Sequence, residues 1–172
     1  MMNPTRKDGR SPRALPVVVL LALSGSAAAG CDPEPLEPGT EGCIFERSAV
    51  TECTVAVLEI SGGIAGTSDV YVVRDDGTVK HIDRTTGAFE ERVVPGGEAR
   101  AARLADALDA THVREAEMGC YLPDAEVADG LAVRLTLHEE GRLWFFGSDC
   151  DSGPAALVEA VDLLEDYVQE AM

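Results

Sequence analysis

The chain has 172 residues, which is enough for one domain of ordinary size and too short for two full-sized ones. Its apolar fraction of 45%, with 17 glycines and 9 prolines, excludes a collagen-like or wholly disordered chain. The 14 basic residues are outnumbered by 31 acidic ones, which gives a net charge of -17. Because binding to a phosphate backbone needs clustered cations, this balance argues against nucleic acid as a partner.

The first thirty residues have the order of a secretory signal peptide. Four basic residues open the chain, an apolar run follows from Ala14 to Leu23, and small residues from Ser24 to Gly30 lead to Cys31. The apolar run is too short to span a bilayer. We therefore expect residues 1–30 to be a leader that directs the chain out of the cytoplasm.

The end of this leader, Ala28-Ala29-Gly30-Cys31, resembles the lipobox of bacterial lipoproteins, in which the cysteine becomes the lipidated first residue. The usual leucine three places before the cysteine is replaced by Ala28 here. The resemblance predicts a chain that is exported and held at the bacterial cell envelope by acyl chains on Cys31. Lipidation would also leave an even number of cysteines, which suits an oxidising compartment. The alternative is ordinary cleavage after Ala29.

Residues 31–42 are predicted to be an extended tether. The segment contains three prolines, which lack backbone donors, and four acidic residues, which repel one another. At about 3 Å per residue it would lift the following domain roughly 30 Å from a membrane. Without the leader the chain has 10 basic and 30 acidic residues, a net charge of -20, which keeps a tethered domain soluble.

The remainder, residues 43–172, is predicted to fold as one domain. Patterns of β-branched and alternating apolar residues predict strands over 54–60, 70–74, 79–83, 88–94, 131–138 and 143–146. Apolar residues at helical spacing predict helices over 98–110 and from Pro154 to Val168. Because hairpin turns such as Asp76-Gly77 join the strands, we expect an α+β fold. Its antiparallel sheet would carry two main helices packed on one face.

Four cysteines lie in the predicted domain, and in an exported chain they indicate disulfides instead of metal ligands. Three pairings are possible. We favour Cys43–Cys53, which ties the start of the domain to its first strand, and Cys120–Cys150, which clamps the segments that flank the hairpin 131–146. Closing a loop of about thirty residues stabilises the fold by about 3 kcal/mol.

Patterns typical of catalysis or metal binding are missing from the sequence. His81, His112 and His138 lie far apart, and there is no H-E-x-x-H or C-x-x-C pair. No G-x-S-x-G elbow or P-loop occurs outside the leader. Asp149 and Asp151 precede the last helix, where capping explains them better than an EF-hand loop. We therefore expect no enzyme activity, no cofactor and no metal.

The glycine-rich segment Ser61-Gly62-Gly63-Ile64-Ala65-Gly66 connects two predicted strands. One interpretation is a tight turn whose glycines have positive φ, and the composition alone favours it. The other is a loop whose bare backbone lets a partner approach closely. In that case Ile64 is a projecting apolar tip.

Six segments of the predicted domain share their order and motifs with one known family. They are Leu58 to Gly66, Asp76-Gly77, Leu104 with Leu108, Tyr121-Leu122-Pro123, Leu131 to Phe146 and Pro154 to Val168. Together they resemble the emfourins, which are small proteinaceous inhibitors of thermolysin-like metalloproteases. This chain places Ile64 where the family usually has Phe, and it adds cysteines and a predicted lipid anchor. The resemblance implies an emfourin-like domain and, beyond that, a secreted metalloprotease as partner of the loop Ser61 to Gly66.

The sequence thus predicts a membrane-anchored exported lipoprotein with a small binding domain, which inhibits a metalloprotease. The alternative is an envelope lipoprotein with a structural or assembly role and no inhibitory activity. An acidic surface and a tether suffice for that second role.

Overall fold

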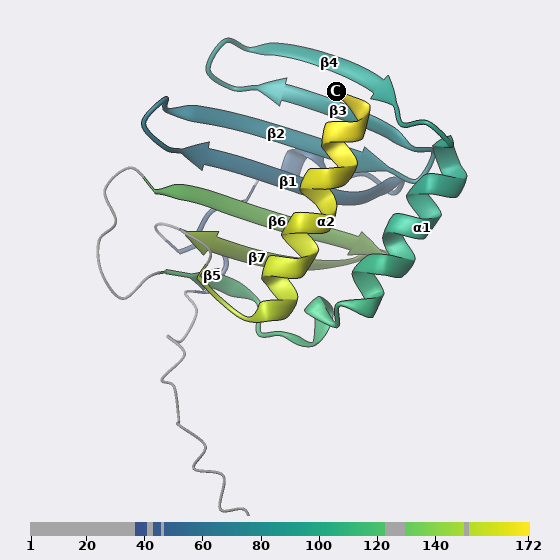
Figure 1. Ribbon diagram of the computed structural model, residues 1–172. Helices are drawn as coiled ribbons and strands as arrows, with labels where there is room; N and C mark the ends of the chain where they lie inside the picture. The colour runs from purple at the N-terminus through teal and green to yellow at the C-terminus, as the bar shows by residue number, and fades with distance from the viewer. Residues whose placement is uncertain (1–36, 41–42, 46, 123–129, 150–151) are drawn as a thin grey trace, which may run out of the picture. The chain divides into compact units, whose positions relative to one another are not determined.

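The computed structural model describes residues 37–40, 43–45, 47–122, 130–149 and 152–172, all within one compact unit, Cys31–Met172. This part of the chain forms a seven-stranded sheet with two long helices (Figure 1). The elements are η1 Arg47–Ala49, β1 Thr54–Gly62, β2 Thr67–Arg74, β3 Thr78–Asp83, β4 Ala88–Val93, α1 Gly97–Ala110, η2 Val113–Glu115, β5 Gly119–Tyr121, β6 Leu131–Glu139, β7 Arg142–Asp149 and α2 Ala155–Ala171. The predicted α+β class is confirmed.

The strands lie in the order β4-β3-β2-β1-β6-β7-β5. Neighbours are antiparallel except at one edge, where β5 runs parallel to β7. The sheet is therefore mixed, and the prediction of a wholly antiparallel sheet is wrong at this edge. The physical reason is that β5 follows α1 and η2 and not a hairpin turn, so the chain crosses the sheet before it pairs.

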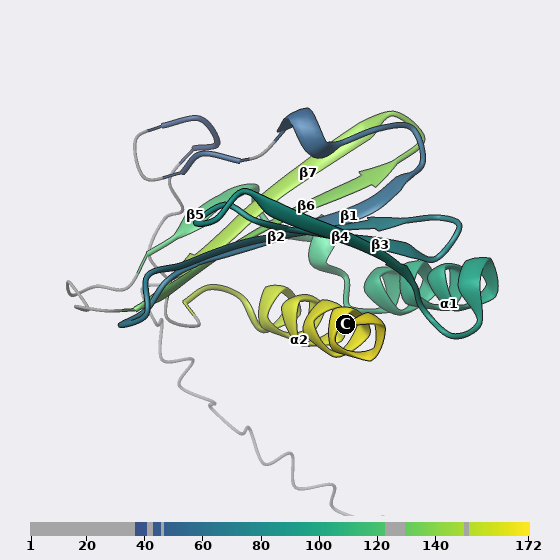
Figure 2. The same cartoon turned by 90° about the horizontal axis from the view of Figure 1, so that it is seen from above.

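The main hydrophobic core lies between the sheet and the two helices. Alternate residues of the central strands, including Leu58, Leu135 and Phe146, are fully buried there. The apolar stripes of α1 and α2 complete the cluster with Leu104, Leu108, Leu157, Val161, Leu164 and Val168. Figure 2 shows α1 and α2 on the same side of the sheet. Arg100 of α1 joins the helices through two hydrogen bonds of 2.7 and 2.8 Å to the carboxylate of Glu170.

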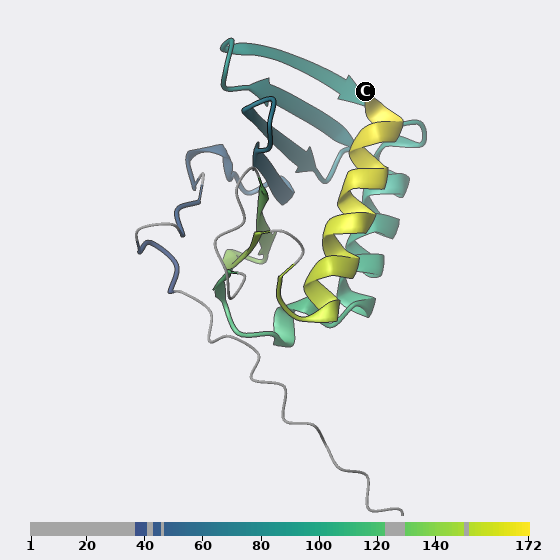
Figure 3. The same ribbon diagram turned by 60° about the vertical axis from the view of Figure 1, so that its left-hand side comes forward.

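The opposite face of the sheet carries two smaller apolar clusters. One is formed by Val57, Val70 and Val72 with residues 49–50, and the other by Cys43, Phe45, Cys120 and Phe145. Figure 3 shows the segment that contains η1 on this side and the helices on the other. The sheet is thus covered on both faces in its centre, since Phe146 points to the helices while Phe145 contacts Phe45 at a ring-centroid distance of 5.2 Å.

The structure contains a disulfide between Cys43 and Cys120, with a Cα–Cα distance of 5.5 Å. The predicted pairs Cys43–Cys53 and Cys120–Cys150 are therefore wrong. The unpredicted edge strand β5 places Cys120 on the sheet face that residues 43–45 cover, so cysteines far apart in sequence meet in the second cluster. Cys53 is an exposed free thiol, and Cys150 lies outside the described residues.

Candidate functional site

The glycine-rich segment forms the tip of the β1–β2 hairpin. Ser61 and Gly62 are the last residues of β1, and the turn leads into β2 at Thr67. Gly62, Gly63 and Gly66 all have positive φ, so the tight-turn interpretation describes the backbone correctly. Ile64 projects from this turn with 92% of its surface exposed. A tight turn is thus compatible with Ile64 as a projecting apolar residue.

Hydrogen bonds inside and outside the hairpin fix the turn. The Gly66 N–H donates to the Gly63 carbonyl at 3.0 Å, and the Thr67 hydroxyl donates to the Gly62 carbonyl at 3.1 Å. The Gly63 N–H donates to the carbonyl of Gly130, just before β6, at 3.1 Å. The tip is therefore attached to the residue that precedes β6 as well as to its own hairpin.

The close approach to Gly130 explains why Gly62 is a glycine. A Cβ at Gly62 would lie 2.5 Å from the Gly130 carbonyl oxygen, closer than real Cβ contacts come. A Cβ at Gly63 would lie 3.2 Å from Cδ2 of Leu131, which is itself 49% exposed. We call Ile64 and Leu131 the apolar tip. Sequence reasoning missed the role of Leu131, because its alternation with polar residues indicated only an ordinary strand position.

Paired charges hold the base of the hairpin on the sheet face opposite the helices. Glu59 of β1 is 8% exposed, and its Oε2 lies 3.3 Å from Nη2 of Arg84. On the other side of β1, Nη1 of Arg134 donates to Oδ1 of Asp149 at 2.6 Å. Glu59, Arg84 and Arg134 line a cavity of about 220 Å³ together with Ser61. Separating these pairs would leave buried charges without a partner, which is costly. The contacts therefore restrain the strands that carry the tip.

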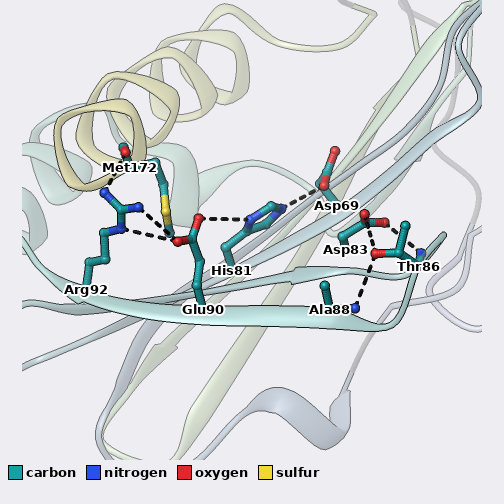
Figure 4. Close-up of polar contacts among 8 residues, drawn as sticks. All are labelled: Asp69, His81, Asp83, Thr86, Ala88, Glu90, Arg92 and Met172. Carbon is teal, nitrogen blue, oxygen red and sulfur yellow. Dashed lines mark hydrogen bonds and ion pairs between the residues drawn. The ribbon is translucent and has the colours of Figure 1, made fainter.

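A second polar cluster lies on β2, β3 and β4 (Figure 4). His81 Nε2 lies 2.7 Å from Oδ1 of Asp69, and its Nδ1 lies 3.9 Å from Oε1 of Glu90. The ring of Tyr71 stacks on His81 at 4.7 Å. Burial raises the pKa of Tyr71, and the charges of Asp69, Glu165 and Glu90 raise it further. His81 of β3 thus contacts carboxylates of both neighbouring strands, Asp69 of β2 and Glu90 of β4.

The other two histidines also make local contacts. His138 Nδ1 lies 3.0 Å from the Thr54 carbonyl oxygen, and His112 Nδ1 lies 3.1 Å from Glu115. Within the described ranges, no group of three or more His, Cys, Asp or Glu side chains could hold a metal ion. In the same part of the chain, no helix is both long and apolar enough to cross a membrane. The predicted lipidation site Cys31 lies outside the described residues.

Comparison of the chain with protein-family models gives no match, and comparison with curated proteins gives none either. The emfourin resemblance therefore rests on the motifs of the sequence alone.

Proposed function

We propose that the chain is an exported lipoprotein, anchored through Cys31, whose domain over residues 43–172 inhibits a secreted thermolysin-like metalloprotease. In this proposal the helices form a layer on one face of an emfourin-like sheet, and the β1–β2 hairpin enters the protease cleft. The observation that carries the proposal is that Ile64 is 92% exposed and lies on a turn that hydrogen bonds hold in place.

An isoleucine in this position is suited to bind a preformed apolar pocket. Transfer of its side chain from water into a pocket contributes about 1.5–3 kcal/mol, which corresponds to roughly a 10- to 150-fold change in affinity. The attachment of the turn to Gly130 reduces the conformational entropy that binding would otherwise remove. Glycines on both sides of Ile64 leave space for the backbone of the partner.

The neighbouring Leu131 widens this contact. Its side chain lies against Gly63 and is half exposed, so it continues the apolar surface from Ile64 toward β6. Apolar anchors of this kind bind best when they are surrounded by contacts that exclude water. We therefore expect Ile64 to enter a pocket and Leu131 to cover its edge.

The test measures the inhibition constant of the full chain against a thermolysin-like metalloprotease, for wild type and Ile64→Asp. We expect Ile64→Asp to raise the inhibition constant at least about 100-fold, because a charge replaces the apolar anchor. Circular dichroism should be unchanged, since the residue contacts solvent. Met118→Asp, another exposed apolar residue at 45% exposure, is the matched control and should inhibit like wild type.

Two outcomes contradict the proposal. Inhibition that does not depend on Ile64 would show that the hairpin tip is not the contact. Absence of inhibition across a panel of secreted metalloproteases would favour the structural or assembly role in the envelope.

A further inference from the structure

The strand β4 forms one edge of the sheet and has no neighbour beyond it among the described residues. Every residue of β4 is exposed, including two large apolar side chains, Phe89 at 70% and Val93 at 63%. Such an edge offers unpaired backbone donors and acceptors to another strand. Its pairing with β3 is regular over the whole strand, from Ala88 opposite Asp83 to Val93 opposite Thr78.

The hydrogen bonds of β4 determine which of its backbone groups point outward. The Val94 N–H donates to the Gly77 carbonyl of the preceding turn at 3.0 Å. In an antiparallel pair, alternate residues bond to the same neighbour, so residues 92, 90 and 88 also face β3. The N–H and C=O groups of Phe89, Glu91 and Val93 therefore point away from the sheet.

The side chains around these outward groups are arranged symmetrically about Glu91. Two residues before it stands Phe89 and two residues after it stands Val93, while Glu90 and Arg92 flank it with opposite charges. We propose that β4 pairs antiparallel with β4 of a second copy of this chain, about a two-fold axis at Glu91. The two sheets then join edge to edge.

In this register the side chains on either side of Glu91 meet suitable partners. Phe89 lies opposite the partner's Val93, and Glu90 lies opposite the partner's Arg92. Glu91 lies opposite the partner's Glu91, but Nη2 of Arg74 is 3.7 Å from its carboxylate and offsets that repulsion. The contact is isologous, as a two-fold dimer requires.

The alternative registers are unfavourable. A shift by one residue would place outward backbone groups opposite inward ones, so no ladder could form. A shift by two residues would place Glu90 against the partner's Glu90, or Arg92 against the partner's Arg92. Charges on an edge strand commonly prevent pairing. The register about Glu91 is favoured because it pairs Glu90 with the partner's Arg92, and because Arg74 lies near its one like-charge pair. The hairpin tip stays outside the contact, since β2 and β3 separate β1 from β4, so this proposal stands independently of protease binding.

The first test measures the molar mass of the full chain by light scattering in a mild non-ionic detergent. We expect a monomer–dimer equilibrium that shifts toward dimer when the ionic strength rises from about 0.01 M to about 0.15 M. The added salt shortens the Debye length from about 30 Å to about 8 Å, which weakens the repulsion between the two negatively charged chains. Glu91→Pro removes an N–H that β3 does not use and should leave a folded monomer. Arg92→Glu should also give monomer, and the double variant Glu90→Arg with Arg92→Glu should restore the dimer.

The second test reads the register by crosslinking in a Cys53→Ser background, which removes the exposed free thiol. Glu91→Cys should form an intermolecular disulfide on mild oxidation, because a hydrogen-bonded pair has Cα atoms about 5.5 Å apart and disulfides need about 4.4–6.8 Å. Ala88→Cys is the control, since its two copies would lie about 20 Å apart. A chain that is monomeric under all these conditions would overturn the proposal. So would a folded Glu91→Pro dimer, or equal crosslinking at residues 88 and 91.

Discussion

At the scale of single residues, Gly62 is the position on which the shape of the tip depends most. Its φ is +96°, and a Cβ there would lie 2.5 Å from the Gly130 carbonyl oxygen. Gly66 has a φ of +61°, and no atom lies within 4 Å of the point that a Cβ would occupy there, so it shares the backbone conformation without the close contact. A side chain at Gly66 would therefore meet only backbone strain, whereas one at Gly62 would meet backbone strain and a steric clash. Comparing the two substitutions measures the two effects separately.

We predict that Gly66→Ala lowers the free energy of unfolding by about 1–2 kcal/mol, the cost of a side chain in the left-handed region. Gly62→Ala should lower it by a further 1–3 kcal/mol or so, because the hairpin must also move away from β6. Urea unfolding followed by circular dichroism measures both. Equal midpoints for the two variants would show that the contact with Gly130 does not constrain the hairpin.

Sequence reasoning located this loop because three glycines between strand patterns are a local signal. It could not supply Gly130 or Leu131 as neighbours, since their contact with the tip arises only when β6 pairs with β1. The apolar tip was thus half predicted, with Ile64 found and Leu131 missed.

At the scale of elements, features set by local chemistry were predicted well and features set by distant pairing were not. The helix expected over 98–110 is observed as Gly97–Ala110, and the strand expected over 88–94 as Ala88–Val93. The strand β5 was missed because three residues carry no periodicity. Its absence from the prediction led directly to the wrong disulfides, since Cys120 could not then be placed beside residues 43–45.

The disulfide gives a prediction for how the amino-terminal segment is held. It closes a loop of 77 residues, and in the chain-entropy model its loss costs about 4.5 kcal/mol of unfolding free energy. Cys43→Ser should therefore lower stability by an amount of that order, while Cys53→Ser, which removes an exposed free thiol, should change little. Denaturant unfolding measures both variants. A non-reducing peptide map that links Cys43 to Cys53 would contradict the pairing.

At the scale of the whole molecule, the net charge and the layered fold bear on whether the folded domain could bind a membrane by itself. The chain carries a strong net negative charge, and its sheet is covered on both faces in the centre. Nothing in this arrangement favours attachment of the folded part to an anionic membrane, because the net charge would repel it. In the proposed function, the lipid on Cys31 would therefore supply the membrane attachment.

We accordingly predict that wild type enters the detergent phase in a phase-separation experiment, and that Cys31→Ala stays in the aqueous phase. Several acyl chains on one residue hold a protein stably because each buried methylene contributes about 0.8 kcal/mol, which the acidic domain cannot replace. Cys53→Ser keeps Cys31 and is the matched control, so it should partition like wild type. Mass spectrometry of the mature amino terminus should find an acylated Cys31. An unmodified terminus at Gly30 would instead show ordinary cleavage after Ala29, and the domain would then be secreted without an anchor.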